Sequence, residues 1–278
     1  MLGPLRTRIA RKVSGVFNDT ARGEQPVTRR PDGLFGPDAV AWAVHGDVTT
    51  MMIGGVSSLL LQMLHPAVLA GVWDHSNFRA DMHGRLRRTA RFIAITTYGS
   101  REEAGAAIDR VNHIHADIGG ALPDGRPYRA DDPSLLAWVH VTEALSFLAA
   151  WRRYAEPGMP EARQDRYFAE VGQIGRALGA DPIPTTRAEA EALVAAMRPQ
   201  LRADARTHTV ADMVLTQRAQ DLLLEPALGL TLRAGIDLLP EWAREMHGLA
   251  PSPIERHAVR IGAHGLARTL RWAFARRS

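Results

Sequence analysis

The uncharged stretch VTTMMIGGVSSLLLQMLHPAVLAGVW, residues 48–73, decides the fold. Its length would suffice for a membrane span. However, Gly-Gly and Ser-Ser pairs, a glutamine and His65-Pro66 interrupt the apolar run, which favours a helix buried on all sides in a soluble core. Because Pro66 cannot donate a backbone hydrogen bond to the preceding turn, we expect a bend beside His65. A bend next to a polar side chain predicts a cavity wall, which His75 beyond the end of the run would share.

The sequence on both sides of this stretch carries the spacing of helices, and strand-like alternation is almost absent. The helical segments are 84–98, 101–118, 134–154, 158–180, 186–201 and 210–235. A turn-rich stretch, GGALPDGRPYRADDP, separates the second of these from the third. The pattern predicts an all-α protein with a single mainly helical domain at 36–250. We expect a loose basic arm at 1–35 and a basic amphipathic tail at 251–278.

The composition is that of a soluble globular chain. Of its 278 residues, 46% are hydrophobic and 23% are charged, and this length can bury a full core. The absence of cysteine excludes disulfides, iron–sulfur clusters and thiolate ligands to a metal. Any bound metal must therefore be held by histidine, by carboxylates or by a cofactor ring.

The basic residues gather at the two ends of the chain. The net charge is +4, and Lys12 is the single lysine. We predict no nucleic-acid partner, because the sequence contains no recognised binding module. Residues 256–278 are helix-like and have two readings: a surface helix docked by its apolar side, or an anchor to an anionic membrane surface. Its apolar residues are Val259, Ile261, Leu266, Leu270 and Trp272. No apolar segment of a secretory signal follows the basic N-terminus.

The stretch RVNHIHADIGG, residues 110–120, contains two histidines. His115 shares a helix face with the apolar residues Val111 and Ile118, whereas His113 points about 200° away. Two histidines at this spacing cannot chelate one metal ion. His115 is therefore the only good ligand candidate of the two, and a hydrogen-bonded core histidine is the other interpretation.

Arg85 and Thr89 lie four residues apart, and Phe92 and Thr96 continue the same stripe. This spacing aligns a guanidinium, a hydroxyl and an aromatic ring along one side of a helix. An arginine at the edge of an apolar pocket suits the carboxylate of a ligand. The alternative is an ordinary surface arginine.

His140 and Glu143 form an H-x-x-E pair on the segment 134–154. A di-iron bundle needs two E-x-x-H pairs and two further glutamates, which this chain does not supply. The sequence also contains no G-x-S-x-G motif and no glycine-rich phosphate loop after a strand, which excludes serine hydrolases of the α/β type and nucleotide-binding folds.

Three motifs in order carry a family resemblance. They are GGVSSLLLQMLHPAVLAGVWDHSNFRADMHGRLRRT (54–89), RVNHIH (110–115) and LPDGRPYRADDPSLLAWVH (122–140). Together they resemble a bacterial and fungal family of haem-containing oxygenases. This family includes the latex clearing proteins, which cleave polyisoprene, and the fungal oxygenase of mycophenolic acid biosynthesis. The resemblance covers roughly residues 35–245.

The resemblance implies a mainly helical fold with a globin-like core and a b-type haem. It also implies that one proximal histidine holds the iron, that His115 is this ligand, and that O2 takes the open position opposite it. Arg85 and Thr89 match an Arg-x-x-x-Thr pair near the haem. Arg85 would pair with a haem propionate or polarise oxygen, and Thr89 would donate a hydrogen bond on the distal side. The remaining residues implied at the pocket are His65, His75 and His140, the last orienting a ligand from behind.

The chain departs from the latex clearing proteins at two positions. Arg88 stands where they carry a distal lysine, and no glutamate precedes Arg85 at the position of their proposed base. We therefore expect not polyisoprene but an apolar or lipid-like unsaturated small molecule, in the cytoplasm or at the inner membrane surface. Two alternatives stay open: a haem-binding or haem-sensing protein without turnover, and a cofactor-free membrane-associated scaffold.

Overall fold

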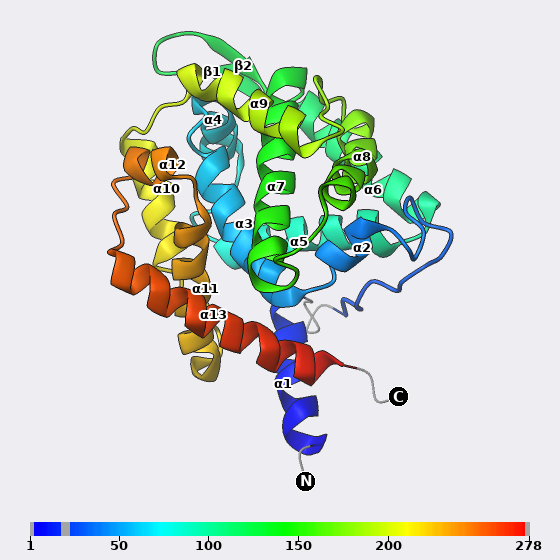
Figure 1. Cartoon of the computed structure of the whole chain (residues 1–278). Helices are drawn as coiled ribbons and strands as arrows, with labels where there is room; N and C mark the ends of the chain where they lie inside the picture. Colours follow the sequence, from blue (N-terminus) through cyan, green and yellow to red (C-terminus); the bar gives the residue numbers. More distant parts are fainter. Residues whose placement is uncertain (1–2, 18–22, 276–278) are drawn as a thin grey trace.

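The computed structural model describes residues 3–17 and 23–275. Throughout this part of the chain helices dominate, which confirms the expected all-α class (Figure 1). The elements are α1 (Gly3–Phe17), α2 (Val40–Val44), α3 (Val48–Gln62), α4 (Pro66–His75), α5 (Met82–Tyr98), α6 (Arg101–Ala116), β1 (Gly119–Ala121), β2 (Pro127–Arg129), α7 (Pro133–Tyr154), α8 (Glu161–Ala177), α9 (Arg187–Met197), η2 (Arg198–Gln200), α10 (Ala205–Leu215), η3 (Leu222–Leu224), α11 (Glu225–Leu238), α12 (Glu241–Met246) and α13 (Pro253–Phe274). The two strands pair antiparallel, with Gly119 opposite Arg129, in the stretch expected to be turns.

The central pair of helices is α3 and α7, which pack along each other (Figure 1). A Cβ atom on Gly54 of α3 would lie 2.8 Å from Cδ1 of Phe147 and 2.9 Å from the carbonyl oxygen of Ser146. Glycine is therefore needed for this close approach to the α7 backbone. Gly235 of α11 allows a second close approach to α3, since a Cβ atom at this position would lie 2.5 Å from Cγ1 of Val56. The uncharged stretch thus packs against two helices at once.

The expected break at His65-Pro66 is confirmed and is sharper than a bend. Helices α3 and α4 meet at 104°, and Pro66 is the first residue of α4, where its missing N–H costs no intrahelical bond. Among the described residues, α7 is the one single helix long and apolar enough to cross a membrane, and 61% of that apolar window is buried inside the molecule. The α3–α4 pair meets the same criterion only if the two are counted together.

Helices α5 and α6 form a separate hairpin beside the central pair. A turn at Gly99–Ser100 joins them, and Ser100 and Glu103 make a reciprocal capping box at the start of α6. Helix α5 packs against α6, α1 and α2 and approaches α3 and α7 only sparsely. Most of its residues before Thr96 are half-buried. The space between α5 and the central pair is where the cavities described below lie.

The two chain ends are more ordered than the sequence suggested. The arm at 1–35 contains α1, which packs against α13 and α5, so it is not loose throughout; residues 18–22 of this arm lie outside the described residues. The C-terminal segment is helix α13, which lies across α11 and α1 (Figure 1). Its buried positions are Ala263, Ala267 and Ala273, so the helix docks through small residues, whereas Ile261 and Trp272 of the expected apolar set are exposed.

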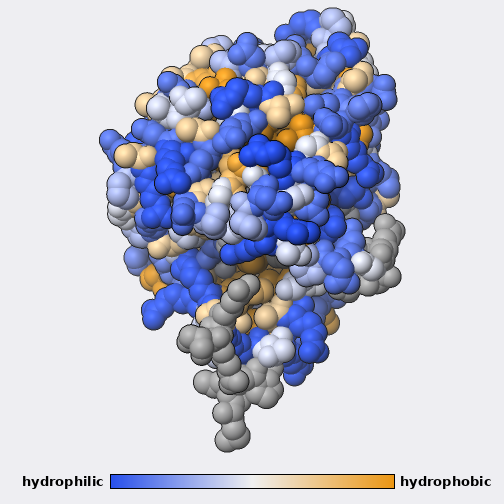
Figure 2. Space-filling view, turned by 90° about the vertical axis from the view of Figure 1, so that its right-hand side faces the viewer, coloured by the Kyte–Doolittle hydropathy of each residue, from blue (hydrophilic) through white to orange (hydrophobic). Residues whose placement is uncertain are grey.

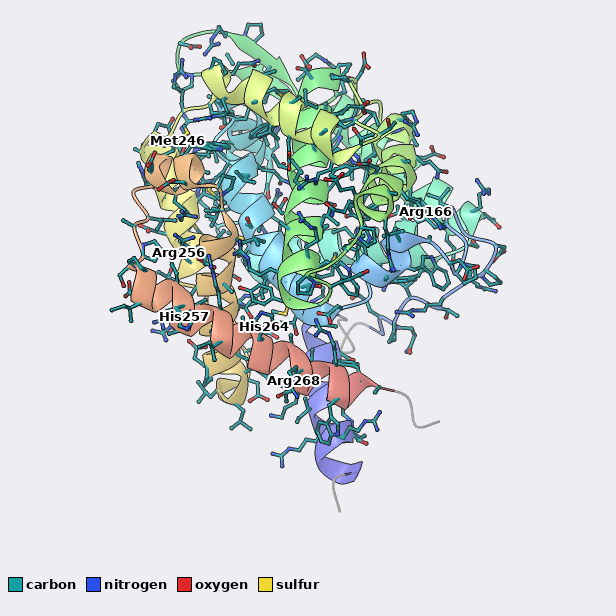
Figure 3. All side chains as sticks on the ribbon, in the orientation of Figure 1. Arg166, Met246, Arg256, His257, His264 and Arg268 are labelled. Atoms are coloured by element: carbon teal, nitrogen blue, oxygen red, sulfur yellow. The ribbon has the colours of Figure 1, made fainter. Side chains whose placement is uncertain are left out.

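Ion pairs fix α13 to the body. The buried Asp237 of α11 accepts hydrogen bonds from Arg256 and Arg260 of α13 and from Arg153 of α7. Figure 3 labels Arg256 among the side chains along α13. Although burial alone would raise the pKa of Asp237, the hydrogen bonds from Arg260 and Arg256 outweigh it and hold that pKa below its ordinary value. This cluster therefore joins α7, α11 and α13.

Candidate functional site

Two cavities lie along one face of α5. The first, called the Arg85 cavity, spans about 450 Å³, which includes space open to solvent. The second, called the Glu143 cavity, spans about 340 Å³, which likewise includes space open to solvent. The Arg85 cavity is lined by Leu59, Gln62, Met63, Val68, Leu69, Val72, Phe78, Met82, Arg85, Leu86, Val210 and Val214. The Glu143 cavity is lined by His45, Phe92, Ile93, Thr96, His140, Glu143, Ala144, Phe147, Tyr167, Val171 and Ile174.

Helix α5 contributes to both cavities at helical spacing. Arg85 and Leu86 lie on the wall of the first, and Phe92 and Thr96 lie on the wall of the second. Helices α3 and α7 form much of the facing wall. Gln62 of α3, on the wall of the Arg85 cavity, donates a hydrogen bond to the carbonyl oxygen of Val139 on α7. Three residues of the expected stripe on α5, Arg85, Phe92 and Thr96, therefore line mostly apolar space, whereas Thr89 does not.

Arg85 is a half-buried guanidinium without a carboxylate partner among the described residues. Its Nη1 donates to the hydroxyl of Ser76 at 2.9 Å. Burial, followed by the charge of Arg88, lowers its pKa from the ordinary value. An arginine in an apolar cavity with free donors is a binding group for an anionic head group, since its planar fork matches a carboxylate.

Glu143 is a half-buried carboxyl group that makes no hydrogen bond or ion pair within the described part of the chain. Burial raises its pKa to about 7, because desolvation penalises the charged form. It can therefore hold or release a proton near neutral pH. A carboxyl group of this kind in a cavity is typical of a functional site.

His140 lies one helical turn before Glu143 and lines the same cavity. Its Nε2 is buried without a hydrogen-bond partner. Burial, followed by the charge of Arg176, lowers its pKa to about 4, so the imidazole is neutral at pH 7. The ring packs close to Gly175 of α8, where an added Cβ would lie 3.1 Å from His140 Cδ2.

His45 and Tyr167 form a hydrogen-bonded wall of the Glu143 cavity. The Nε2 of His45 lies 2.9 Å from the Tyr167 hydroxyl, and its Nδ1 lies 2.8 Å from the Thr97 hydroxyl. Burial lowers the pKa of His45 to about 3. Burial, with the nearby Glu143, raises the pKa of Tyr167 well above its ordinary value. Both groups are neutral at pH 7, and no motif or spacing in the sequence singles out either of them.

His115 is half-buried in the last turn of α6, and its Nδ1 is buried without a partner. Burial lowers its pKa, and the charge of Asp131 partly opposes this. The structure places His115 on neither cavity wall, although it lies about as far from the Gly99–Ser100 turn along α6 as Arg85 does along α5. His113 is exposed, as the helical wheel predicts.

The other expected pocket residues are not brought to the cavity walls. Thr89 is exposed, and its hydroxyl donates to the carbonyl oxygen of Arg85 at 3.3 Å. His75 is exposed and donates to the carbonyl oxygen of Gly119. His65 is buried against Trp138, with Nε2 3.5 Å from Oε1 of Gln200. Of the residues expected at the pocket, Arg85 and His140 line the two cavities.

The donor set limits the kind of metal centre that these residues can form. Within residues 3–17 and 23–275, no three His, Asp or Glu side chains converge into a metal-binding group. A single histidine can nevertheless complete the coordination of a metal held by a cofactor ring. His115, neutral at pH 7 and with a free buried nitrogen, meets that requirement chemically.

Comparison with known proteins gives one family. Residues 42–272 match the family described as "ER-bound oxygenase mpaB/B'/Rubber oxygenase, catalytic domain". No curated protein and no solved structure matches the chain. The matched region contains both cavities and every expected site residue, and the chain therefore belongs to this family of oxygenase catalytic domains.

Proposed function

We propose that this protein is a haem b-dependent oxygenase acting on an apolar or lipid-like unsaturated small molecule. The observation that carries the proposal is the mostly apolar space along α5, with the unpaired guanidinium of Arg85 at one cavity and the polar pair of His140 and Glu143 at the other. Membership of an oxygenase family supports the reaction class. The chemistry of the available side chains supports the cofactor.

The residues present fit a haem in their chemistry. A porphyrin is a flat apolar ring with two carboxylates and four ring nitrogens for the iron, so the protein has to add an axial ligand, apolar walls and a cation. His115 offers a neutral, unpartnered imidazole nitrogen. Arg85 offers a guanidinium that no described carboxylate occupies. Met82, Leu86 and Phe78 provide apolar contact beside it.

A bound haem would supply the redox chemistry by which an oxygenase activates O2. The chain's own residues shape the surroundings of that reaction. Phe92, Ile93 and Phe147 give the Glu143 cavity an apolar wall, which limits the contact of its polar groups with water. Glu143 holds or moves a proton at its carboxyl oxygens near pH 7. His140 remains neutral and can accept or donate one hydrogen bond at Nε2.

A haem titration tests the proposal. The wild-type chain should bind haem with a Soret band and a one-to-one endpoint, and His115→Ala should abolish the band while circular dichroism shows a folded protein. His113→Ala is the matched control, because His113 is exposed two residues away; this variant should bind normally. No Soret band in the wild type would overturn the proposal. Loss of the band in His140→Ala, but not in His115→Ala, would move the ligand to α7.

We also propose a cytoplasmic protein that contacts the inner membrane surface through α13. Ile261 and Trp272 are exposed on this helix, and Arg268, labelled in Figure 3, lies between them in sequence. Apolar side chains interspersed with arginines suit the interface of an anionic membrane. Vesicles with anionic lipid should bind the wild type more tightly than Ile261→Asp, and equal binding would contradict the contact.

A further inference from the structure

The Glu143 cavity contains a carboxyl group that the fold does not satisfy. Phe92, Ile93 and Phe147 surround it with apolar surface. In the described part of the chain, Glu143 receives no hydrogen bond and faces no ion-pair partner. Buried polar groups without partners are costly and rare in folded proteins. A half-buried carboxyl group without a protein partner on the wall of a pocket therefore indicates a binding group.

A second unsatisfied polar atom lies beside it. Nε2 of His140 is buried without a partner, and His140 and Glu143 are three residues apart on α7, so they share one side of that helix. The remaining polar groups of the wall are already engaged: His45 with Tyr167 and Thr97, and Thr96 with the carbonyl oxygen of Phe92. The free hydrogen-bonding capacity of the cavity is therefore concentrated at Glu143 and His140.

The charges around the cavity decide which head group fits. Among the described residues no arginine forms an ion pair with Glu143, and the charge of Arg176 acts on the neighbouring His140. Above pH 7 Glu143 is mainly ionised, and in this form it accepts hydrogen bonds and cannot donate them. A second carboxylate would be repelled, whereas a hydroxyl or an ammonium group would supply the missing donor.

We propose that the Glu143 cavity binds the head group of the substrate, and that this head group is a hydrogen-bond donor, a hydroxyl or a protonated amine, on a small apolar body. Glu143 accepts the hydrogen bond, and His140 Nε2 makes a second one to the same head group. Phe92, Ile93 and Phe147 contact the apolar body next to it. This inference rests on the proposed function, because it names the substrate class of that site, but the binding can be measured without haem.

The pH dependence of binding follows from the groups that face Glu143. On the cavity wall they are His140 on α7, His45 at the end of α2 and Tyr167 on α8; Glu170 of α8 acts on Tyr167, and Arg176 of α8 acts on His140. Between pH 6 and 8, His140 and His45 remain neutral because burial lowers both pKa values, and Tyr167 remains protonated because burial raises its pKa. Glu143 is the group whose pKa, raised to about 7, falls in this interval. Ammonium binding should therefore strengthen as the pH rises from 6 to 8.

Calorimetric titration with four six-carbon probes tests the inference: hexylamine, hexan-1-ol, hexanoate and hexyl methyl ether. The purified protein is used with its haem content recorded. Hexylamine and hexan-1-ol should bind at least about tenfold more tightly than hexanoate and the ether, a factor that corresponds to one hydrogen bond or ion pair. Equal binding of the ether would overturn the inference, because the ether has the same apolar body but no donor.

Two variants locate the effect. Glu143→Gln keeps the shape and an acceptor oxygen, so it should lose most hexylamine affinity, roughly tenfold or more, and its pH dependence, while it keeps hexan-1-ol binding within about threefold. Glu191→Gln, at an exposed acid on α9, should change nothing. Unchanged hexylamine binding in Glu143→Gln would overturn the inference. The haem titration tests His115 and the proposed function, whereas the calorimetric titration tests Glu143 and the head-group site. Either proposal can therefore be refuted without the other.

Discussion

Replacing Glu143 with glutamine should remove a pH-dependent loss of stability. Burial raises the pKa of this carboxyl to about 7 in the folded protein, against an ordinary value of 4.5. Below pH 4.5 both states are protonated. Between these values the folded state keeps a proton that the unfolded state releases, so stability falls as the pH rises toward 7, by about 1.4 kcal/mol per pH unit. Above pH 7 the full penalty, about 3 kcal/mol, is present.

The variant Glu143→Gln has no ionisable group at this position and should lack this fall. The free energy of unfolding of the variant minus that of the wild type should therefore be about 2 kcal/mol more positive at pH 8 than at pH 5.5. This is an upper bound, since Glu143 keeps contact with the cavity. Urea denaturation at both pH values, with circular dichroism, measures it. A change below about 0.5 kcal/mol, equal to that of the exposed control Glu191→Gln, would refute the reasoning.

Other substitutions test the packing that holds the site. Asp237→Asn should destabilise the chain by roughly 2–4 kcal/mol, since it removes the charge that three arginines share. Urea denaturation would measure the loss, and α13 should be cleaved faster by a protease. An unchanged cleavage rate would contradict the role of the Asp237 ion pairs in holding α13. Gly54→Ala should lower the free energy of unfolding by about 1–3 kcal/mol, because the added Cβ would meet the α7 backbone. A thermal midpoint equal to that of the wild type would show that the contact between α3 and α7 can accept a methyl group. His45→Phe should lose two hydrogen bonds at pH 7, but its stability should fall less steeply than that of the wild type as the pH is lowered. The pKa of His45 is about 3, so its neutral burial favours folding above pH 6.5 and loses that contribution as the pH falls toward 3, by about 1.4 kcal/mol per pH unit. Thermal melts from pH 7 to pH 4 would test this, and an unchanged slope would count against it.

The features predictable from the sequence were those governed by local periodicity. The uncharged stretch 48–73 specifies a buried helix, and its proline specifies where that helix breaks. Both effects depend only on residues that are close in the sequence. The same holds for His115 and His113, which a helical wheel separates into a half-buried and an exposed position.

The features missed were those that depend on tertiary packing. His45 and Tyr167 meet from α2 and α8, which are far apart in sequence, so no spacing rule joins them. Thr89 shares its stripe with Arg85, yet its hydroxyl turns back to the helix backbone, a local bond that competes with any ligand. His75 ends α4, so its position depends on the angle of 104° between α3 and α4. The proline predicts a break there but does not fix that angle.

The ends of the chain illustrate a different limit. The basic arm has few apolar residues, and its helix α1 is held by contacts with α13 and α5 rather than by a strong local signal. The face formed on the side of α2, α6 and α8 is largely hydrophilic with scattered apolar residues (Figure 2), so the sequence pattern of charges there reports solvent exposure and gives no separate functional signal.

The position of iron tests the central claim most directly. Crystals of the protein expressed with a haem precursor would allow iron to be located by its anomalous scattering. The proposed function predicts one iron per chain, bonded to a ring nitrogen of His115, with a haem carboxylate at Arg85. Iron bonded to His140, or a fully occupied iron site away from α5 and α6, would contradict it.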